Sequence, residues 1–335
     1  MSMSSSPKKH HYLPQTIQRN FLADGEKLLW YYDREKDKYE QRTPKGIAKV
    51  RHLYSYDGVS LDQRYVLEKA FSVLEGKAAP IFLKLQKTEA INQEEHNIIS
   101  EFVGMQYFRT PIKLDAITGV IDKGVEYFIE NMHDKIVDMS DDDFQIFINQ
   151  YGEQSGKEVS AITKENLMSY LMSGNIKLSN AKNFQLNTLV DAGTNLGIKL
   201  SARRWVILHT KPSHEFITSD VGLHLTVDGD ATRNTGFGPG SPGMAIIFPF
   251  AKDAALMITS MPSANIAHVN FDNELVSVVN AGLARVSGQL YSSNKVLLEK
   301  LVKAGNLAKT IFKPIFDEEQ MRLFAQKHFF EVSNR

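Results

Sequence analysis

The chain has 335 residues, of which 42% are hydrophobic and 23% are charged, as in an ordinary soluble globular protein. Lysine and arginine together number 39, as do aspartate and glutamate, so no overall positive field favours nucleic acid and such binding would need a local basic patch. There is no cysteine, which excludes disulfides and thiolate zinc sites and favours a reducing cytoplasm.

Charge is unevenly placed along the chain. Residues 1–52 hold eleven lysine and arginine residues against six acids, which predicts a docking face near the beginning of the chain. The lysines at positions 8 and 9 lead into two histidines and not into an apolar segment, unlike a secretory signal. Because the apolar runs fall well short of the ~18 residues that span a membrane, we expect a cytoplasmic protein with no membrane contact. The sequence leaves the oligomeric state open.

The first segment of chemical interest follows a tail. Residues 1–9 are rich in serine and lysine, and we expect them to be disordered. Residues 10–21 are dense in side chains that bond or ionise, and a helix after the proline would place Gln15 and Arg19 on one face. His11 is a candidate acid/base, although a single histidine near a terminus is more often a surface residue.

A hairpin and two helices are predicted next. Residues 27–32 and 38–42 flank a charged tip and predict antiparallel strands. Ser60 with Gln63, and Asn92 with Glu95, form capping boxes that start helices with apolar residues at helical spacing. Glu75 lies beside the apolar stripe of the first helix, where a carboxylate is usually a solvated edge residue.

Two polar side chains continue the apolar stripe of the second helix. Gln106 lies four residues after Phe102, and Arg109 lies three further on, before Thr110 and Pro111 end the helix. Burying an amide or a guanidinium without partners costs several kcal/mol, so both need partners. We expect Arg109 to face Glu75 or Asp220.

Residues 115–200 predict mainly helices, and strands dominate after residue 200. Residues 205–208 and 216–217 predict a hairpin whose second strand ends in Ser219 and Asp220, where a sheet presents side chains to a pocket. Asp220 in that place could bind a metal, orient a histidine or cap a turn. A simple turn made by the Ser-Asp pair is the more common case.

The last part of the chain predicts closing helices. The glycine-rich loop 236–243 precedes a strand and lacks the lysine and helix start of a phosphate loop, so no nucleotide-cofactor motif is present. A helix after Asp272 places Asn280 on its core-facing stripe. Further helices are predicted from Ser293 and over residues 317–330.

These elements predict an α+β protein that is helical in its first two thirds with an early β-hairpin, followed by a mostly antiparallel sheet with closing helices. We expect residues 10–335 to form a single α+β domain. The alternative is a subdivision into a mainly helical part, 10–200, and a part of sheet plus helices, 201–335.

Two motifs carry a resemblance to a known family. Residues 11–15 read H-Y-L-P-Q, and residues 205–220 run from a tryptophan to F-I-T-S-D. They resemble the opening H-Y-[VL]-P-Q motif and the later W…F-[IV]-T-S-D-N-P segment of an uncharacterised, mostly bacterial family, domain of unknown function 4238. Val221 and Gly222 depart from its usual Asn-Pro, whereas its pattern also fits Glu75, Gln106, Arg109 and Asn280. The resemblance implies membership without an activity; the bacterial distribution suggests a role in phage defence, which no residue here supports.

The polar residues support a hydrolase hypothesis, with a nuclease favoured. Hydrolysis of a phosphodiester needs a proton shuttle and a cation aimed at the developing negative charge. Three side chains would act in catalysis. Because no HExxH motif is present, the ligands of any divalent metal would have to come from residues that are distant in the sequence. The catalytic candidates are His11, Glu75 and Asp220, and the binding candidates are Gln15, Arg19, Gln106, Arg109, Ser219 and Asn280.

Two other hypotheses stay open. The same residues fit a non-catalytic module that binds a ligand or nucleic acid through a buried polar network. They also fit a network that only stabilises the fold. An open concave site with His11 and Asp220 close together favours catalysis, a sealed network favours a structural role, and a wide basic groove favours binding.

Overall fold

The structure of the chain is a computed structural model that describes residues 8–174, 176, 178, 181–227, 238–263, 266–270 and 273–305. These residues fall into two compact units. The larger takes in the described residues up to Asp115 and from Leu186 onward, and the smaller takes in those of Ala116–Gln185. Helices dominate the first two thirds and a mostly antiparallel sheet follows, so the predicted α+β class is confirmed. The single-domain organisation stays a prediction.

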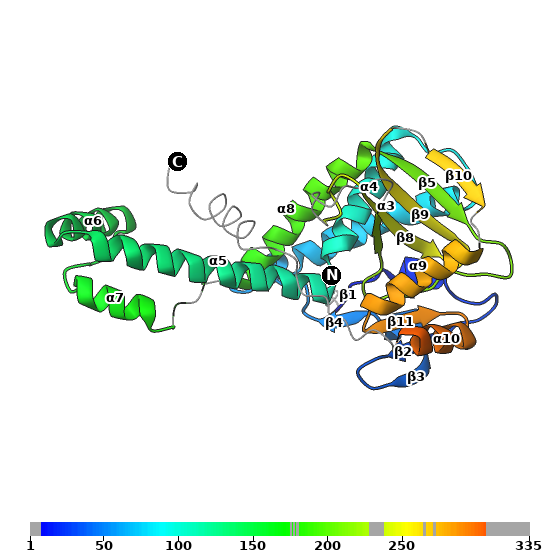
Figure 1. Cartoon of the computed structure of the whole chain (residues 1–335), viewed down its shortest axis with the longest axis horizontal. Helices are drawn as coiled ribbons and strands as arrows, with labels where there is room; N and C mark the ends of the chain where they lie inside the picture. Colours follow the sequence, from blue (N-terminus) through cyan, green and yellow to red (C-terminus); the bar gives the residue numbers. More distant parts are fainter. Residues whose placement is uncertain are drawn as a thin grey trace, which may run out of the picture. The chain divides into compact units, whose positions relative to one another are not determined.

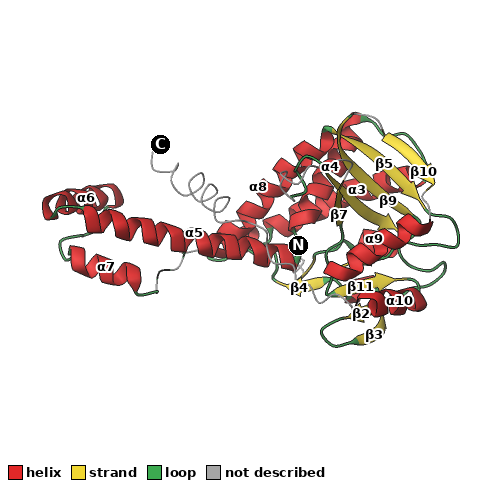
Figure 2. Ribbon diagram, viewed as in Figure 1, coloured by secondary structure: helices red, strands yellow, loops and turns green. Residues whose placement is uncertain are grey.

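Figure 1 labels most of the elements and Figure 2 separates helices from strands. In chain order they are β1 (Lys9–His11), α1 (Gln15–Arg19), β2 (Leu29–Asp33), β3 (Lys38–Arg42), the short 3-10 helix η1 (Pro44–Gly46), β4 (Lys49–Arg51), α2 (Leu61–Arg64), α3 (Val66–Gln86), α4 (Gln93–Phe108), α5 (Pro111–Asp138), α6 (Asp141–Ser155), α7 (Lys164–Met172), α8 (Ala181–Ser201), β5 (Arg203–His209), β6 (Thr218–Ser219), β7 (His224–Val227), β8 (Met244–Ala251), β9 (Ala254–Pro262), β10 (Ile266–Asn270), α9 (Asn273–Val286), β11 (Gln289–Ser292) and α10 (Lys295–Gly305).

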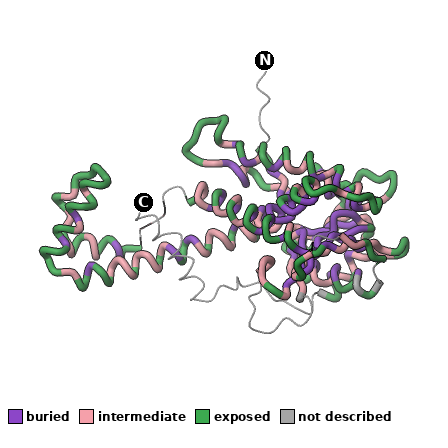
Figure 3. The backbone as a smooth tube through the Cα atoms, turned by 90° about the horizontal axis from the view of Figure 1, so that it is seen from above, coloured by how far each residue is buried: buried purple, intermediate pink, exposed green. Residues whose placement is uncertain are grey.

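The largest sheet of the larger unit has the strand order β10-β5-β9-β8-β7, antiparallel except for the β10-β5 pair. Every residue of β8 is buried. Helices α3 and α4 pack on this strand through aromatic contacts of Phe82 and Phe102 with Phe248, and of Phe82 with Phe250. All four of these rings are buried. Figure 3 shows buried residues in purple, concentrated in the larger unit.

A second sheet joins strands from both ends of the chain. The predicted hairpin is confirmed as β2 and β3, which pair in antiparallel register from Leu29 with Arg42 to Asp33 with Lys38. Strand β11 pairs with β2 on one side and with β6 on the other, giving the order β3-β2-β11-β6. A separate antiparallel pair, β1 with β4, is formed by the H-Y-L-P-Q region. The early strands therefore lie in the same unit as residues near position 220 and 290.

The predicted hairpin of residues 205–208 and 216–217 is wrong. β5 lies in the five-stranded sheet between β9 and β10, whereas β6 begins at Thr218 and pairs only with β11 among the described strands. The physical reason lies in the partners: β5 finds long antiparallel pairing with β9, and the Phe216 amide donates to the Lys252 carbonyl at 2.7 Å. The two runs are consecutive in sequence but serve different sheets.

Both predicted capping boxes are confirmed. The Ser60 hydroxyl accepts from the Gln63 amide at the start of α2, and the Asn92 side chain accepts from the Glu95 amide at the start of α4. The first predicted helix is interrupted at Tyr65, whose φ of −110° and ψ of 14° separate α2 from α3. Local capping signals therefore located both helix starts.

Helices α4 and α8 cross where three glycines meet. A Cβ atom added to Gly104 would lie 2.3 Å from the Gly193 carbonyl oxygen and 2.6 Å from the Gly197 amide nitrogen. Both neighbours are backbone atoms, which cannot rotate away. We therefore expect Gly104→Ala to destabilise the protein by about 1–3 kcal/mol, measured by urea unfolding, because the helices must separate.

A matched control lies in α3, where a Cβ atom on Gly76 would meet nothing within 4 Å. Gly76→Ala should leave stability unchanged or raise it by about 0.5–1 kcal/mol, since alanine favours a helix interior over glycine. Equal effects of the two substitutions would contradict the close crossing.

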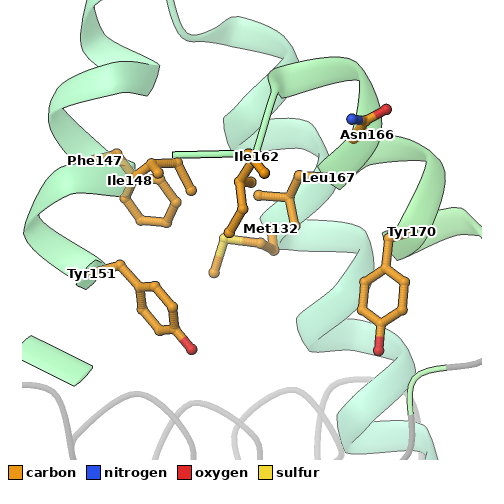
Figure 4. Close-up of a pocket in the computed structure, with 9 residues that line it drawn as sticks. Met132, Phe147, Ile148, Tyr151, Ile162, Asn166, Leu167 and Tyr170 are labelled. Atoms are coloured by element: carbon orange, nitrogen blue, oxygen red, sulfur yellow. The ribbon is translucent and has the colours of Figure 1, made fainter. Parts of the chain in front are cut away.

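The smaller unit consists of helices with its own apolar cluster, formed by Ile136, Phe144, Ile148 and Leu171. Beside this cluster lies a mainly apolar cavity of about 420 Å³. Figure 4 shows Tyr151 and Tyr170 on either side of the apolar side chains that line it.

Several predictions from the sequence concern residues that the structure does not describe. Residues 1–7 of the predicted tail, Asp272, and the helix predicted over residues 317–330 lie outside the described residues. Lys9 begins β1, and the Lys8 carbonyl accepts from the His52 amide. Within the described residues, every helix is too short or too polar to cross a membrane.

Candidate functional site

At the start of the H-Y-L-P-Q region, two neighbouring histidines differ in burial. On β1, His10 is fully buried, its ring stacks on Tyr54, and its Nδ1 accepts from the Tyr54 amide at 3.0 Å. The next residue, His11, is half-buried, and burial lowers the pKa of its ring to about 4. At neutral pH the His11 ring is therefore uncharged.

Two buried side chains of α4 and its end hold the main chain of this region. The Gln106 amide donates to the Tyr12 carbonyl at 2.9 Å, and the Arg109 guanidinium donates to the His11 carbonyl at 2.6 Å. Both side chains are almost completely buried. Gln106 and Arg109 were expected to need hydrogen-bond partners, and these include the main-chain carbonyls of the H-Y-L-P-Q motif.

Arg109 also forms an ion pair with Glu75, one of the two acids predicted to face it. Its Nη2 lies 2.7 Å from Glu75 Oε1, and its guanidinium lies over the rings of Phe71 and Tyr54, 4.6 and 5.7 Å from their centroids. Burial acts to lower the pKa of Arg109, but the Glu75 carboxylate and Tyr54 outweigh it and raise that pKa above its ordinary value. Arg109 thus stays charged and ties α3 to the strand β1.

Tyr12 points into a cluster of hydroxyl and amide groups. Its hydroxyl donates to Gln289 Oε1 at 2.9 Å and lies 3.1 Å from the Tyr291 hydroxyl, which donates to the same Gln289 oxygen at 2.7 Å. Burial raises the pKa of Tyr12 well above its ordinary value, so the phenol keeps its proton. Asp220 lies close enough to contribute to that increase.

Asp220 is the acid of this cluster. Its Oδ2 accepts from the Gly288 amide at 3.1 Å, and its own amide donates to the Gln289 carbonyl. Burial raises the pKa of the Asp220 carboxyl to about 6, against the opposing effect of the backbone hydrogen bonds. A carboxyl with this pKa can gain or lose a proton near neutral pH, as a general acid or base must.

Asp220 and Tyr12 line one cleft of about 650 Å³ in the larger unit. Its walls come from β1, the β2-β3 hairpin, η1, β4, the start of α5 and the β6 and β11 region. The lining residues are Lys9, Tyr12, Tyr31, Asp33, Lys36, Lys38, Glu40, Arg42, Gly46, Ile47, Ala48, Lys49, Val50, Arg51, Pro111, Ile112, Asp220 and Gln289.

The basic residues of this cleft divide into two groups. Lys36 pairs with Asp33, and Lys38 and Arg42 pair with Glu40, so those charges are offset locally. In contrast Lys9, Lys49 and Arg51 form no ion pair with a described carboxylate.

We call Lys9, Lys49 and Arg51 the strand cations, because all three lie on the β1-β4 pair. Lys9 is directly opposite Arg51 in the register, and like charges in that position repel each other. Burial and the charges of Lys9 and Lys45 lower the pKa of Lys49, a further sign of crowded positive charge. This repulsion would be relieved by a bound anion.

The other predicted site residues lie outside this cleft wall. Gln15 and Arg19 contact each other on the exposed surface of α1 at 3.4 Å. Asn280 accepts from the Ile217 amide and donates to the Glu215 carbonyl, and Ser219 accepts from the Gly222 amide. These contacts stabilise the chain that leads to Asp220. Asn280 and Ser219 therefore support Asp220 in position.

The structure brings Asp220 and the beginning of the chain to one cleft, but through Tyr12 and not through the ring of His11. Among the described residues that line the cleft, His11, Glu75 and Arg109 do not appear. The sequence reasoning missed Tyr12, Gln289 and the strand cations. For the strand cations, the sequence did offer a signal, which was the excess of basic residues in the first 52 positions.

Among the described residues, no three histidine, aspartate or glutamate side chains gather as metal ligands would. The polar groups that line the cleft are hydroxyl, amide, carboxyl and basic groups.

Comparison with known proteins gives one match. A family model with the description "Protein of unknown function (DUF4238)" matches residues 9–292. The matched range begins at the first strand cation and includes the other cleft residues. No match to a curated protein or to a solved structure was found.

Proposed function

This chain belongs to the DUF4238 family, and we propose that its cleft binds the phosphodiester backbone of a nucleic acid and hydrolyses it, with Asp220 as the general base. The observation that carries the proposal is that the strand cations, which form no ion pair with a described carboxylate, line the same cleft as Asp220. Phosphates are anions that lysine and arginine bind through charge-assisted hydrogen bonds.

The chemistry follows from the two kinds of group in the cleft. The Asp220 carboxylate takes a proton from a water molecule, and the water oxygen attacks the phosphorus atom. A phosphorus–oxygen ester bond then breaks, and the leaving oxygen takes a proton from solvent. The strand cations stabilise the negative charge that develops on the phosphoryl oxygens.

Arg109, Glu75 and His11 enter the proposal as positioning groups. The pairing of Arg109 with Glu75 and with the His11 carbonyl holds β1 in place, and β1 carries Lys9 into the cleft. The His11 ring does not line the cleft, so it is not proposed as the base. His11→Ala keeps the main-chain carbonyl that Arg109 contacts, so the cleavage rate should stay close to that of the wild type.

Reversing two strand cations should weaken binding strongly. We expect Lys49→Glu/Arg51→Glu to reduce the affinity for a labelled single-stranded oligonucleotide by at least tenfold in anisotropy titrations. Each phosphate contact contributes about 0.7 to the slope of log affinity against log salt for single strands, so the slope should become shallower by about 1.4.

The matched control is Lys69→Glu/Lys77→Glu, which makes the same change in net charge on exposed positions of α3. It should leave both affinity and salt slope nearly unchanged. Equal losses in the two double variants would mean that net charge alone drives binding, and would remove the cleft from the proposal.

A non-catalytic binding module is the second candidate. It is favoured because the buried side chains of Gln106 and Arg109 donate their hydrogen bonds to main-chain carbonyls and do not point donors into the cleft. Incubation of the wild-type protein with radiolabelled DNA and RNA, with and without divalent ions, separates the two. Binding without any cleavage product would support the module and reject hydrolysis.

A further inference from the structure

Two histidines face each other at the edge of the five-stranded sheet. His209 ends β5, and His268 lies on β10, the edge strand beside β5 in Figure 1. Residues of a strand alternate between the two faces of a sheet. Because His268 is opposite Ile207 in the parallel register, it lies on the same face as His209, one diagonal step away. His209 Nε2 is 3.1 Å from His268 Nδ1.

We propose that the His209–His268 pair binds a divalent transition-metal ion of the zinc, copper or nickel kind. Two nitrogen ligands at about 2.0–2.1 Å from a tetrahedral zinc ion lie about 3.3 Å from each other. The nitrogen separation in the pair, 3.1 Å, is close to this value. Imidazole suits these ions, whereas magnesium and calcium select oxygen ligands.

The surroundings of the pair suit a cation. His268 is exposed and His209 is half-buried, so water can reach the ion and complete its coordination. Burial lowers the pKa of both rings, which keeps their lone pairs free at neutral pH, and the nearby Asp253 carboxylate acts in the opposite direction on His209. Asp253 precedes Ala254, the residue opposite His209 on β9, and supplies negative charge near the site.

Binding exchanges a hydrogen bond for two metal bonds. In the metal-free pair, one of the two facing nitrogens carries a proton and donates a hydrogen bond to the other, and the tautomers decide which one is the donor. In the bound state both facing nitrogens carry no proton, and each neutral ring holds its proton on its other nitrogen. The ion would link the edge strand β10 to β5 and raise the unfolding temperature, since a ligand of the folded state stabilises it.

Calorimetric titration of the full-length protein with zinc chloride tests the proposal. We expect His209→Ala and His268→Ala each to remove one bound zinc or to weaken that site at least tenfold. The control His133→Ala changes a histidine of α5 whose Nδ1 lies 3.2 Å from Asp134 Oδ1, and this variant should bind zinc as the wild type does.

Copper provides a readout of the ligands themselves. Electron paramagnetic resonance of the copper-loaded protein should show coupling to two ring nitrogens that is lost from the site in either variant. Zinc stoichiometry and affinity that are the same in the wild type and in both variants would overturn the proposal, as would a wild-type protein that binds no zinc. Neither result bears on the cleft, which shares no residue with this pair.

Discussion

Asp220→Asn is expected to slow phosphodiester hydrolysis by about 10²- to 10⁴-fold, the usual contribution of a positioned general base. Asparagine has nearly the same shape and can still accept from the Gly288 amide, but it cannot take a proton from water. Binding of uncleaved oligonucleotide should therefore persist. The measurements are single-turnover cleavage for the rate and anisotropy for the affinity.

The pH profile gives Asp220 a signature that a structural role would not. The base must be deprotonated, so kcat/KM should rise with pH and level off above about 6, the pKa of the Asp220 carboxyl. The control Asp24→Asn changes an exposed acid paired with Lys252, outside the cleft, and should keep the full profile. A wild-type cleavage rate in the Asp220 variant would reject Asp220 as the base.

The same shift affects stability in a defined direction. Folded Asp220 binds its proton more tightly than an unfolded aspartate, whose pKa is 3.8, so the folded state is favoured most at low pH. Its contribution falls as pH rises from about 4 to about 6 and is constant above that range. Asp220→Asn should remove this dependence, and urea unfolding at pH 4 and pH 7 measures it.

Arg109→Met is expected to destabilise the protein by about 3–5 kcal/mol, because removing one partner of a buried ion pair leaves the other groups unpaired. The Arg109 side chain is only 3% exposed, and it serves both the Glu75 carboxylate and the His11 carbonyl. Urea unfolding measures the change. A loss below about 1 kcal/mol would mean that water replaces the guanidinium at low cost.

Matched variants separate the ion pair from packing. Arg109→Lys keeps the charge but not the planar fork of donors, so it should recover only part of the lost stability. Glu75→Gln should cost less than Arg109→Met, since Glu75 is 21% exposed. In the double variant, the two losses should be less than additive, as expected for residues in direct contact.

The parts of the fold that the sequence predicted depend on neighbours in the chain. Capping boxes at Ser60 and Asn92 act within three residues, and the β2-β3 hairpin closes over a short charged tip. The partner of Arg109 was also predictable, because a guanidinium on a core-facing stripe requires a nearby acid. Glu75 was one of the two acids proposed for it.

The predictions that failed depend on distant partners. Residues 216–217 were assigned to a hairpin with β5, but the chain around them pairs with Lys252 and β11, segments that local patterns do not identify. In the H-Y-L-P-Q region, attention fell on His11, whereas the hydroxyl of Tyr12 reaches Gln289 and Tyr291. Both contacts span more than 250 residues, so no short motif could indicate them.

The position of the strand cations could likewise be predicted only in part from the sequence. Lys9, Lys49 and Arg51 were visible as part of a basic beginning of the chain, which predicted a docking face. Their close approach arises only from the pairing of β1 with β4 across about forty residues. The excess of charge was readable from sequence, but its concentration on one side of the Asp220 cleft was not.

Hydrogen-exchange mass spectrometry with a bound oligonucleotide tests the central claim most directly, because it locates the contact without assuming turnover. With the Asp220→Asn variant and a saturating single-stranded oligonucleotide, exchange should slow in peptides that cover β1, β4 and β11. Protection confined to other segments, such as α6 and α7, with these strands unchanged, would contradict a phosphodiester in this cleft.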